Sequence, residues 1–335
     1  MDILNLLDAM HGALAQGIIW SIMTLGVYMT FRILDFPDMT VDGSFATGGA
    51  VAAMLVGNCG ANPFLALLAS MGAGMLCGFV TGFLTTKMRI PGILAGILTM
   101  TALYSINIRI MGSQAMIPLN GVDTVDTIIK HSIPGISAKN SQILLGGIVA
   151  AAVIAFLYWF FGTELGSAIR ATGNNPYMVR SLGVNTDTTT ILALVLSNGL
   201  VSLSGGIYAQ VQGNSSVDMG VGTIVIGLAS VIIGEVILGK HVGFLPRLIC
   251  MVAGSVIYRA VIALVLFLGL KSTDMKLITA IIIAIALFFP TLKKNAVQRS
   301  TRRSMAGMGV PAVEPQAENG IDASDEDPDE ANQKE

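Results

Sequence analysis

Residues 62–86 read NPFLALLASMGAGMLCGFVTGFLTT, the basic turn KMR follows at 87–89, and residues 90–111 read IPGILAGILTMTALYSINIRIM. Each apolar stretch reaches the roughly 20 residues that a helix needs to cross the hydrocarbon core of a bilayer. Similar stretches recur along the chain, so we expect an all-α, polytopic integral membrane helix bundle of about nine spans. The expected spans are 12–31, 43–58, 62–86, 90–111, 142–162, 189–212, 220–239, 243–268 and 277–292.

The composition of the whole chain agrees with a surface that faces lipid. Of its 335 residues, 53% are hydrophobic and only 12% are charged, and the mean hydropathy is +0.73. Soluble domains carry roughly a quarter charged residues. A soluble enzyme, a nucleic-acid-binding protein and a disordered protein are therefore poor descriptions of this chain. The three cysteines lie apart, with no C-x-x-C pair or histidine cluster, which argues against a disulfide framework or a metal site.

The lysines and arginines predict the orientation of the spans, because short basic loops stay in the cytoplasm. With the turn at 87–89 placed inside, strict alternation puts twelve basic residues on the cytoplasmic side and four outside. We therefore expect an extracytoplasmic N-terminus, an extracytoplasmic loop at 112–141 and a cytoplasmic C-terminus. Residues 32–42 fit this frame poorly because they contain three aspartates and one arginine. A re-entrant or broken segment there would remove the conflict.

The chain changes character after the last expected span, which divides it into a transmembrane domain, 1–292, and a tail, 293–335. Residues 293–303 are basic and suit an anionic inner leaflet. Residues 304–335 contain nine acidic residues and one basic residue, and we expect them to be disordered. No chemistry is assigned to this tail.

The positions of small residues predict helix contacts and bear on whether the chain contains an internal repeat. Gly74, Gly78 and Gly82 form overlapping G-x-x-x-G steps, which allow helix backbones to approach closely in lipid. Thr-Val-Asp ending at Asp42 and Ser-Val-Asp ending at Asp218 each precede a helix rich in small residues, on opposite sides of the membrane. This is the pattern of an inverted repeat, which places a transport path at its interface. Chance similarity, or simple helix capping by each aspartate, explains it equally well.

A long polar insert follows the fifth span. Residues 163–188 predict two short helices: one over 164–172 that ends at Gly173, and a second that is capped by Asn175, begins at Pro176 and stops at Gly183. A plain connector needs only a few residues. A short helix on the membrane surface can dock into a groove of a partner, although a purely structural loop is the alternative.

The motifs of this insert resemble a known family. Arg170-Ala171-x-Gly173-Asn174-Asn175, followed by residues 182–187 (LGVNTD), is similar to the cytoplasmic coupling loop of bacterial ABC importer permeases of the ribose/branched-chain amino acid type. Residues 24–56 resemble that family's second block, an apolar span, an Asp-containing break and a Gly/Ala-rich helix. The resemblance covers about residues 10–292. The sequence around Phe36-Pro37-Asp38 most resembles that of a sub-branch of this family, some of whose members are linked to tryptophan or tyrosine uptake.

The resemblance implies a permease subunit of an ATP-driven importer in the plasma (inner) membrane of a bacterium. Two permease copies would form the pore, cytoplasmic ABC ATPases would dock on the insert, and an extracytoplasmic solute-binding lipoprotein would deliver the solute. No cofactor, metal or nucleic acid is implied, and ATP hydrolysis would belong to another chain. The residues implied in ATPase coupling are Glu164, Arg170, Ala171, Gly173, Asn174, Asn175, Pro176, Arg180 and Gly183.

Polar side chains inside spans are candidates for a translocation path, because burying them in lipid is expensive. The candidates are Asp42, Asn107, Asn198, Gln210, Asp218 and Glu235. Asn198 could face a solute or bond across helices. Glu235 could pair with Arg259, or both could lie near span ends with their charged groups in the interface.

Catalysis is not supported by the sequence. Residues 234–240 fit the start of a phosphate-binding loop, G-x-x-x-x-G-K, but His241 follows and the segment ends an apolar span. The alternative function is a secondary carrier driven by an ion gradient, which favours paired carboxylates inside spans, whereas only Glu235 is clearly inside one. The solute is not readable from the residues. An amino acid, in particular an aromatic one, follows from the sub-branch resemblance alone.

Overall fold

The structure is a computed structural model that describes residues 3–132, 137–238, 243–268, 277 and 280–281. The chain divides into two units, 1–287 and 288–335, and every described residue belongs to the first. The predicted tail, 293–335, lies outside the described residues. So does the predicted ninth span, 277–292, apart from residues 277, 280 and 281.

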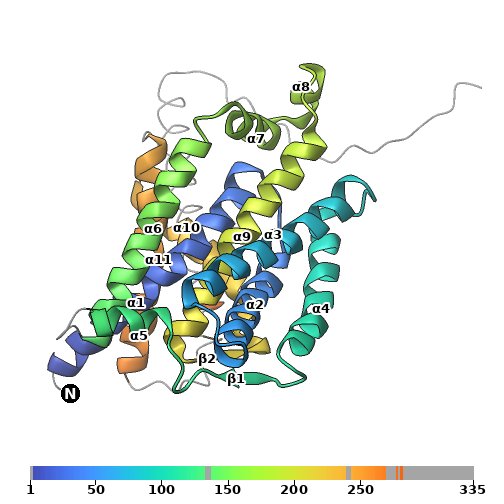
Figure 1. The fold of residues 1–335 in the computed structure, drawn as a ribbon. Helices are drawn as coiled ribbons and strands as arrows, with labels where there is room; N and C mark the ends of the chain where they lie inside the picture. The colour runs from blue at the N-terminus through green and yellow to red at the C-terminus, as the bar shows by residue number, and fades with distance from the viewer. Residues whose placement is uncertain (1–2, 133–136, 239–242, 269–276, 278–279, 282–335) are drawn as a thin grey trace, which may run out of the picture. The chain divides into compact units, whose positions relative to one another are not determined.

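The described part of the chain is built almost entirely of helices (Figure 1). The first half contains α1 (Ile3–Tyr28), η1 (Met29–Ile33), α2 (Thr40–Ala53), η2 (Met54–Asn58), α3 (Pro63–Thr86), α4 (Gly92–Ile110), β1 (Met116–Pro118) and α5 (Val125–Ser132). The second half contains α6 (Ala138–Phe160), α7 (Glu164–Asn174), α8 (Pro176–Ser181), α9 (Thr186–Gln212), β2 (Asn214–Ser216), η3 (Val217–Gly220), α10 (Thr223–Leu238) and α11 (Phe244–Phe267).

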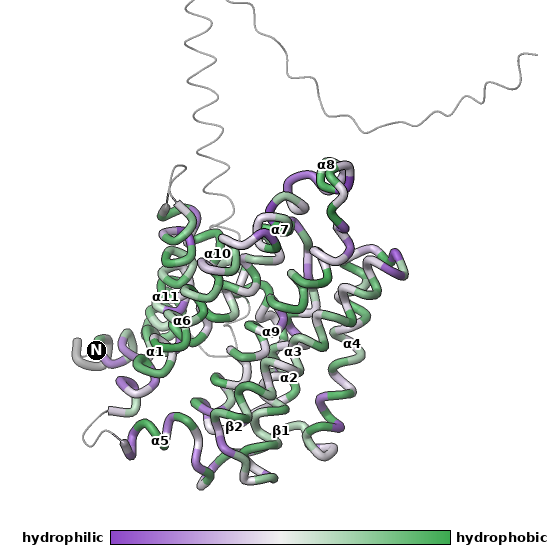
Figure 2. The backbone as a smooth tube through the Cα atoms, turned by 45° about the horizontal axis from the view of Figure 1, so that its top comes forward, coloured by the Kyte–Doolittle hydropathy of each residue, from purple (hydrophilic) through white to green (hydrophobic). Residues whose placement is uncertain are grey.

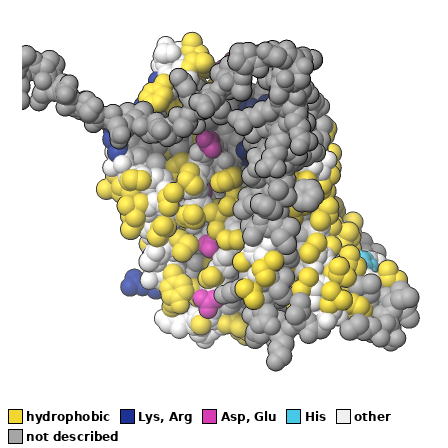
Figure 3. Space-filling view, turned by 180° about the vertical axis from the view of Figure 1, so that it is seen from behind, with side chains coloured by type: hydrophobic (Ala, Val, Ile, Leu, Met, Phe, Trp, Pro, Cys, Tyr) yellow, Lys and Arg dark blue, Asp and Glu magenta, His cyan; other side chains and the backbone are white. Residues whose placement is uncertain are grey.

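Among these residues, seven helices are long and apolar enough to cross a membrane, which confirms the polytopic helical class. The expected count of nine is not confirmed. The expected span 43–58 forms α2, which has only 14 residues before the π-helical turn η2 begins. The long helices are mostly hydrophobic along their length (Figure 2), and hydrophobic side chains cover much of the described surface seen from behind (Figure 3).

Helices α1 and α9 form the centre of the described bundle. In their candidate spans 78% and 67% of the residues are buried, against 28% in α4. The two helices run antiparallel, because the Ser204 hydroxyl donates to the Ile19 carbonyl at 2.9 Å and the Ser197 hydroxyl donates to the Gly26 carbonyl at 2.8 Å. Short polar side chains of α9 thus donate hydrogen bonds to backbone carbonyls of α1.

The outer helices pack on this centre in a reciprocal pattern. Helix α1 contacts α10 and α11, while α9 contacts α2 and α3. Each long central helix is followed by a break, at 34–39 and at 213–222, and then by α2 or α10. This reciprocal packing is compatible with an inverted repeat, which stays a prediction.

The predicted close contact at the glycines of α3 is confirmed. A Cβ atom at Gly74 would overlap the Asn198 carbonyl of α9, and one at Gly78 would overlap the Leu194 carbonyl. Glycine is therefore required at both positions for the two backbones to approach this closely.

A two-stranded antiparallel ribbon lies at the end of the bundle opposite α7 and α8 (Figure 1). It pairs β1 with β2, with Met116 opposite Ser216 and Pro118 opposite Asn214. Both β1 and α5 lie within the expected extracytoplasmic loop, 112–141. The ribbon joins this segment to the end of α9.

Candidate functional site

The insert between α6 and α9 forms the two predicted short helices. The Thr163 hydroxyl caps α7 by accepting from the Gly166 N–H at 3.3 Å, and the Asn175 side chain caps α8 by accepting from the Met178 N–H at 3.0 Å. Pro176 occupies the first position of α8. Gly183 has a φ of +85°, a conformation that favours glycine. The capping predictions are confirmed, with α7 ending at Asn174, one residue beyond Gly173.

Helix α7 is seated tightly on the bundle. A Cβ atom at Gly173 would overlap the Ile33 carbonyl at the end of η1, and one at Gly166 would overlap the Phe160 carbonyl. The hydroxyl groups of Thr172 and Thr189 lie 2.9 Å apart and join α7 to α9. These contacts hold α7 against η1, the end of α6 and the start of α9.

Some of the predicted coupling residues pack against the bundle, and the others lie on its outer surface. Arg170 faces inward: its guanidinium lies 4.0 Å from the Phe244 ring centroid and 5.0 Å from that of Phe161, and its Nε has no hydrogen-bond partner within the described chain. Burial lowers the pKa of Arg170 below its usual value. Ala171 and Gly173 are also partly buried. The exposed members are Glu164, Asn174, Asn175, Pro176, Arg180 and Gly183.

The outer face of α8 presents apolar side chains that the sequence analysis missed. Tyr177 is 81% exposed, Leu182 is 73% exposed and Met178 is 49% exposed. We call these three residues the α8 patch. In the sequence, these three residues stand out as large apolar side chains within an otherwise polar insert. A patch of this kind on a rigidly held helix is typical of a protein interface.

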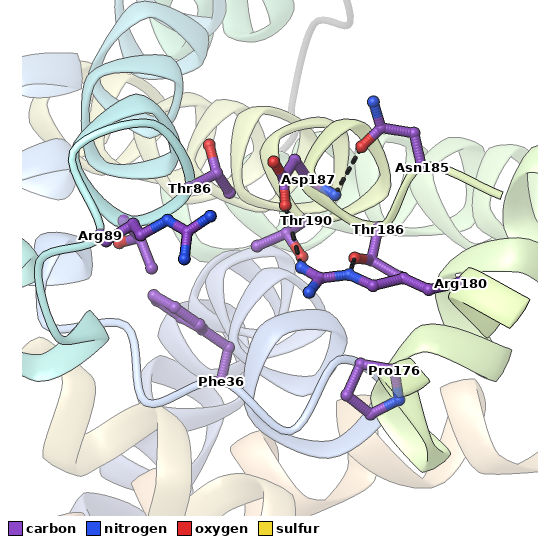
Figure 4. A pocket seen from close by; sticks show the side chains of 10 residues that line it. Phe36, Thr86, Arg89, Pro176, Arg180, Asn185, Thr186, Asp187 and Thr190 are labelled. Carbon is purple, nitrogen blue, oxygen red and sulfur yellow. Dashed lines mark hydrogen bonds and ion pairs between the residues drawn. The ribbon is translucent and has the colours of Figure 1, made fainter. Parts of the chain in front are cut away.

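A cavity of about 500 Å³ lies beside the α8 patch, between α8, the start of α9 and the turn after α3. Arg89 and Arg180 enter it from opposite sides, with Asp187 between them (Figure 4). Arg180 donates to the Thr186 hydroxyl at 2.5 Å and to the Asp187 carboxylate at 3.1 Å. Lys87 lies 3.9 Å from the other carboxylate oxygen of Asp187. Three basic side chains therefore surround one acid, and the cavity has a positive balance of charge.

Asp42, a candidate for the translocation path, forms a cap between α2 and the start of α10. Its carboxylate accepts from the Gly222 N–H at 2.8 Å, the Ile224 N–H at 2.8 Å and the Thr223 hydroxyl at 2.9 Å. These donors form the start of α10, where the helix dipole also favours a negative charge. Asp218, its counterpart in the sequence pattern, is exposed.

Asn198 and Gln210 both bond between elements. Asn198 donates to the Asp38 carboxylate at 2.7 Å and accepts from the Ser44 hydroxyl at 2.6 Å, which fixes the break before α2 against α9. Gln210 donates to the Pro63 carbonyl at 3.2 Å and accepts from the Val125 N–H at 3.0 Å. Both side chains thus hold the bundle together in this structure.

The remaining candidates lie in contrasting settings. Glu235 pairs with Arg32 at 2.5 Å, so the suggested pairing with Arg259 is not formed. Arg259 instead lies over the Trp20 ring, 3.9 Å from its centroid. Asn107 is fully buried in α4, and neither polar atom of its amide has a hydrogen-bond partner within the described residues.

Features of catalysis are not found in the part of the chain that the structure describes. Its histidine, cysteine and acidic side chains form no group of three that could hold a metal ion. The phosphate-loop pattern at 234–240 begins in the helix α10, whereas such a loop links a strand to a helix.

Seven membrane-length helices and an exposed helical insert at one end of the described bundle together define a polytopic membrane protein. The family described as "Branched-chain amino acid transport system / permease component" matches residues 9–287, and the chain belongs to it. The expected resemblance over residues 10–292 is thereby confirmed. The chain is a multi-pass permease subunit of an ABC importer in the inner membrane, and a separate ATPase subunit and a binding protein are its partners.

Two curated relatives and one solved structure illustrate the similarity. The tyrosine transport system permease protein of Clostridioides difficile (strain R20291) is 43% identical over 81% of this chain and 87% of its own length. The inner membrane ABC transporter permease protein YjfF of Escherichia coli (strain K12) is 29% identical over 65% of each chain. The structure of PsaBC from Streptococcus pneumoniae in complex with Fab has 16% identity and a TM-score of 0.48, covering 85% of this chain and 95% of that one.

Proposed function

We propose that the chain acts as a homodimeric permease whose α7–α8 insert docks on the ATPase subunit. The α8 patch carries this proposal, because it is apolar, exposed and mounted on helices whose seat admits little movement. The adjoining cavity adds positive charge that suits acidic side chains of a partner. In this arrangement the C-terminus and the insert face the cytoplasm and the N-terminus faces outward. The tail at 293–335 takes no part in the proposal.

We also propose that the solute is an amino acid, with an aromatic one favoured. The support is the name of the relative with 43% identity, a tyrosine transport system permease. Uptake of labelled tyrosine and of other labelled amino acids, compared between cells that carry the complete importer and cells that lack it, tests this part. Uptake of every amino acid that is equal in the two kinds of cell would overturn it. The secondary carrier gains no support, because Glu235 is engaged by Arg32.

Truncating the α8 patch should remove ATPase docking without unfolding the bundle. In the double variant Tyr177→Ala and Leu182→Ala, we expect ATPase co-purification to fall at least about tenfold, because a central aromatic anchor at an interface contributes about 2 kcal/mol. The control is Leu68→Ala, which removes a large exposed apolar side chain (65%) on α3, away from the α8 patch. Equal ATPase recovery from the double variant and the control would refute docking at this patch.

Asn107 allows a test of the predicted translocation path. An Asn107→Leu variant should be as stable as the parent or more stable, because it removes a buried amide whose polar atoms are unpaired. If Asn107 contacts the solute on its way through, uptake should nevertheless fall. Thermal unfolding and uptake are measured on the same preparation. A stable variant with parental uptake would remove Asn107 from the path.

A further inference from the structure

A permanent cation lies inside the bundle without an acidic partner among the residues that the structure describes. Arg259 belongs to α11, eight residues before its last residue, Phe267, and thus about 12 Å from that end. Within the described residues it forms no ion pair. Its Nη1 donates a long hydrogen bond of 3.4 Å to the Gln16 side-chain oxygen, and its Nε has no partner in the described part of the chain. An arginine within a span is costly and normally paired, so such a residue is a functional candidate.

The face of this cation is covered by an aromatic ring. The guanidinium lies 3.9 Å from the Trp20 ring centroid, a cation–π contact. The indole Nε1 of Trp20 is itself buried and has no hydrogen-bond partner in the described structure. Two side chains in direct contact therefore both carry unused donors. Guanidinium and indole groups can only donate hydrogen bonds, so these two side chains require acceptor atoms from another group.

A cavity of about 220 Å³ opens beside the guanidinium, between α1 and α11. Gln16 and Arg259 are its polar residues, and its other walls include Ala13, Ile262 and Leu266. This volume is below the usual range for drug-sized ligands, so only a small group fits. The walls suit an apolar body, and the guanidinium suits a carboxylate or phosphate, which it can bind through two parallel hydrogen bonds.

We propose that Arg259 and Gln16 form an oxyanion-binding site between α1 and α11, which accepts a carboxylate or phosphate attached to an apolar group. Two sources can supply this chemistry. The first is the carboxylate of the transported solute, which rests on the proposed amino acid transport. The second is a phospholipid that reaches the cavity from the bilayer.

Tryptophan emission provides a direct test, because the chain contains two tryptophans, Trp20 and Trp159. In a full-length Trp159→Phe background, Trp20 alone reports on the guanidinium above it. The protein is placed in phosphatidylcholine nanodiscs and titrated with L-tyrosine, benzoate and L-tyrosinamide, which lacks the carboxylate. We expect a saturable change with one or both carboxylates and none with the amide. A parallel series replaces part of the phosphatidylcholine by phosphatidylglycerol, and a response confined to this series assigns the site to lipid.

Substitutions separate binding from structure. We expect Arg259→Gln to weaken the apparent affinity at least tenfold, and Arg259→Lys to weaken it less because the charge remains. Arg109→Gln serves as the control, since this arginine is an exposed member of α4. Arg259→Gln should not lower the melting temperature, because it removes an unpaired buried charge.

The proposal is overturned if Trp20 emission responds to no carboxylate and no anionic lipid, or if Arg259→Gln responds as the parent does. It is also overturned if both Arg259 variants are unstable while the parent binds nothing, because the residue is then only structural. No ATPase is present in these measurements. If the permease still co-purifies with its ATPase but shows no change in Trp20 emission, the oxyanion site is rejected and the proposed ATPase docking is not.

Discussion

An Asp42→Ala variant should unfold at a markedly lower temperature than the parent and should not support uptake. The substitution leaves two backbone N–H groups and one hydroxyl at the start of α10 without an acceptor. Each buried unpaired donor costs about 1–3 kcal/mol, so a loss on the order of 3 kcal/mol or more in the free energy of unfolding is expected. Thermal unfolding in detergent and uptake by the assembled importer measure the two effects.

The control for Asp42 is its counterpart in the sequence pattern. Asp218 is exposed, and Asp218→Ala should leave the unfolding temperature near that of the parent. If Asp42→Ala unfolds like the parent but blocks uptake, the carboxylate serves the solute and not the cap. Equal behaviour of the two variants in both measurements would contradict the role of Asp42 as a cap of α10.

A Gly173→Val variant should lose ATP-driven uptake through displacement of α7. A side chain at this position overlaps the Ile33 carbonyl, so α7 must move away from η1 and carry α8 with it. We expect recovery of the co-purifying ATPase to fall by about tenfold or more, equivalent to roughly 1.4 kcal/mol of docking free energy. The measurement is the ratio of ATPase to permease after affinity purification.

Gly72→Val is the matched control for the Gly173 variant. A Cβ atom at Gly72 on α3 meets no neighbouring atom within 4 Å, so the added side chain has open space. This control should retain the parental ratio. A parental ratio for Gly173→Val as well would show that the seat of α7 has no bearing on docking.

Features encoded in short stretches of sequence were predictable. The apolar runs predicted the long helices, Asn175 and Pro176 predicted the start of α8, and the spaced glycines of α3 predicted a helix contact. Each of these depends on residues within a few turns of one another, whose spacing fixes the face or cap that they form.

Features that depend on distant partners were not predictable. Asp42 bonds to residues about 180 positions away, and Glu235 pairs with Arg32 and not with Arg259. The exposure of Tyr177 and Leu182 depends on how α7 and α9 hold α8, which no local pattern states. The 14-residue length of α2 follows from the chain break before it and the π-helical turn after it, so counting apolar residues overestimated this span.

Helix α9 has a consequence for how the two ends of the protein communicate. It contains 27 residues, or about 40 Å of continuous helix, and it begins at the α7–α8 insert and ends next to the β1–β2 ribbon. A single rod thus connects two surfaces that meet different compartments. If the ATPase docks on the insert as proposed, and if a shift of α9 at one end alters binding at the other, thermodynamic reciprocity makes that influence equal in both directions. A binding protein that docks on the ribbon would then change the affinity of the ATPase for the opposite end by the same factor that the ATPase changes its own.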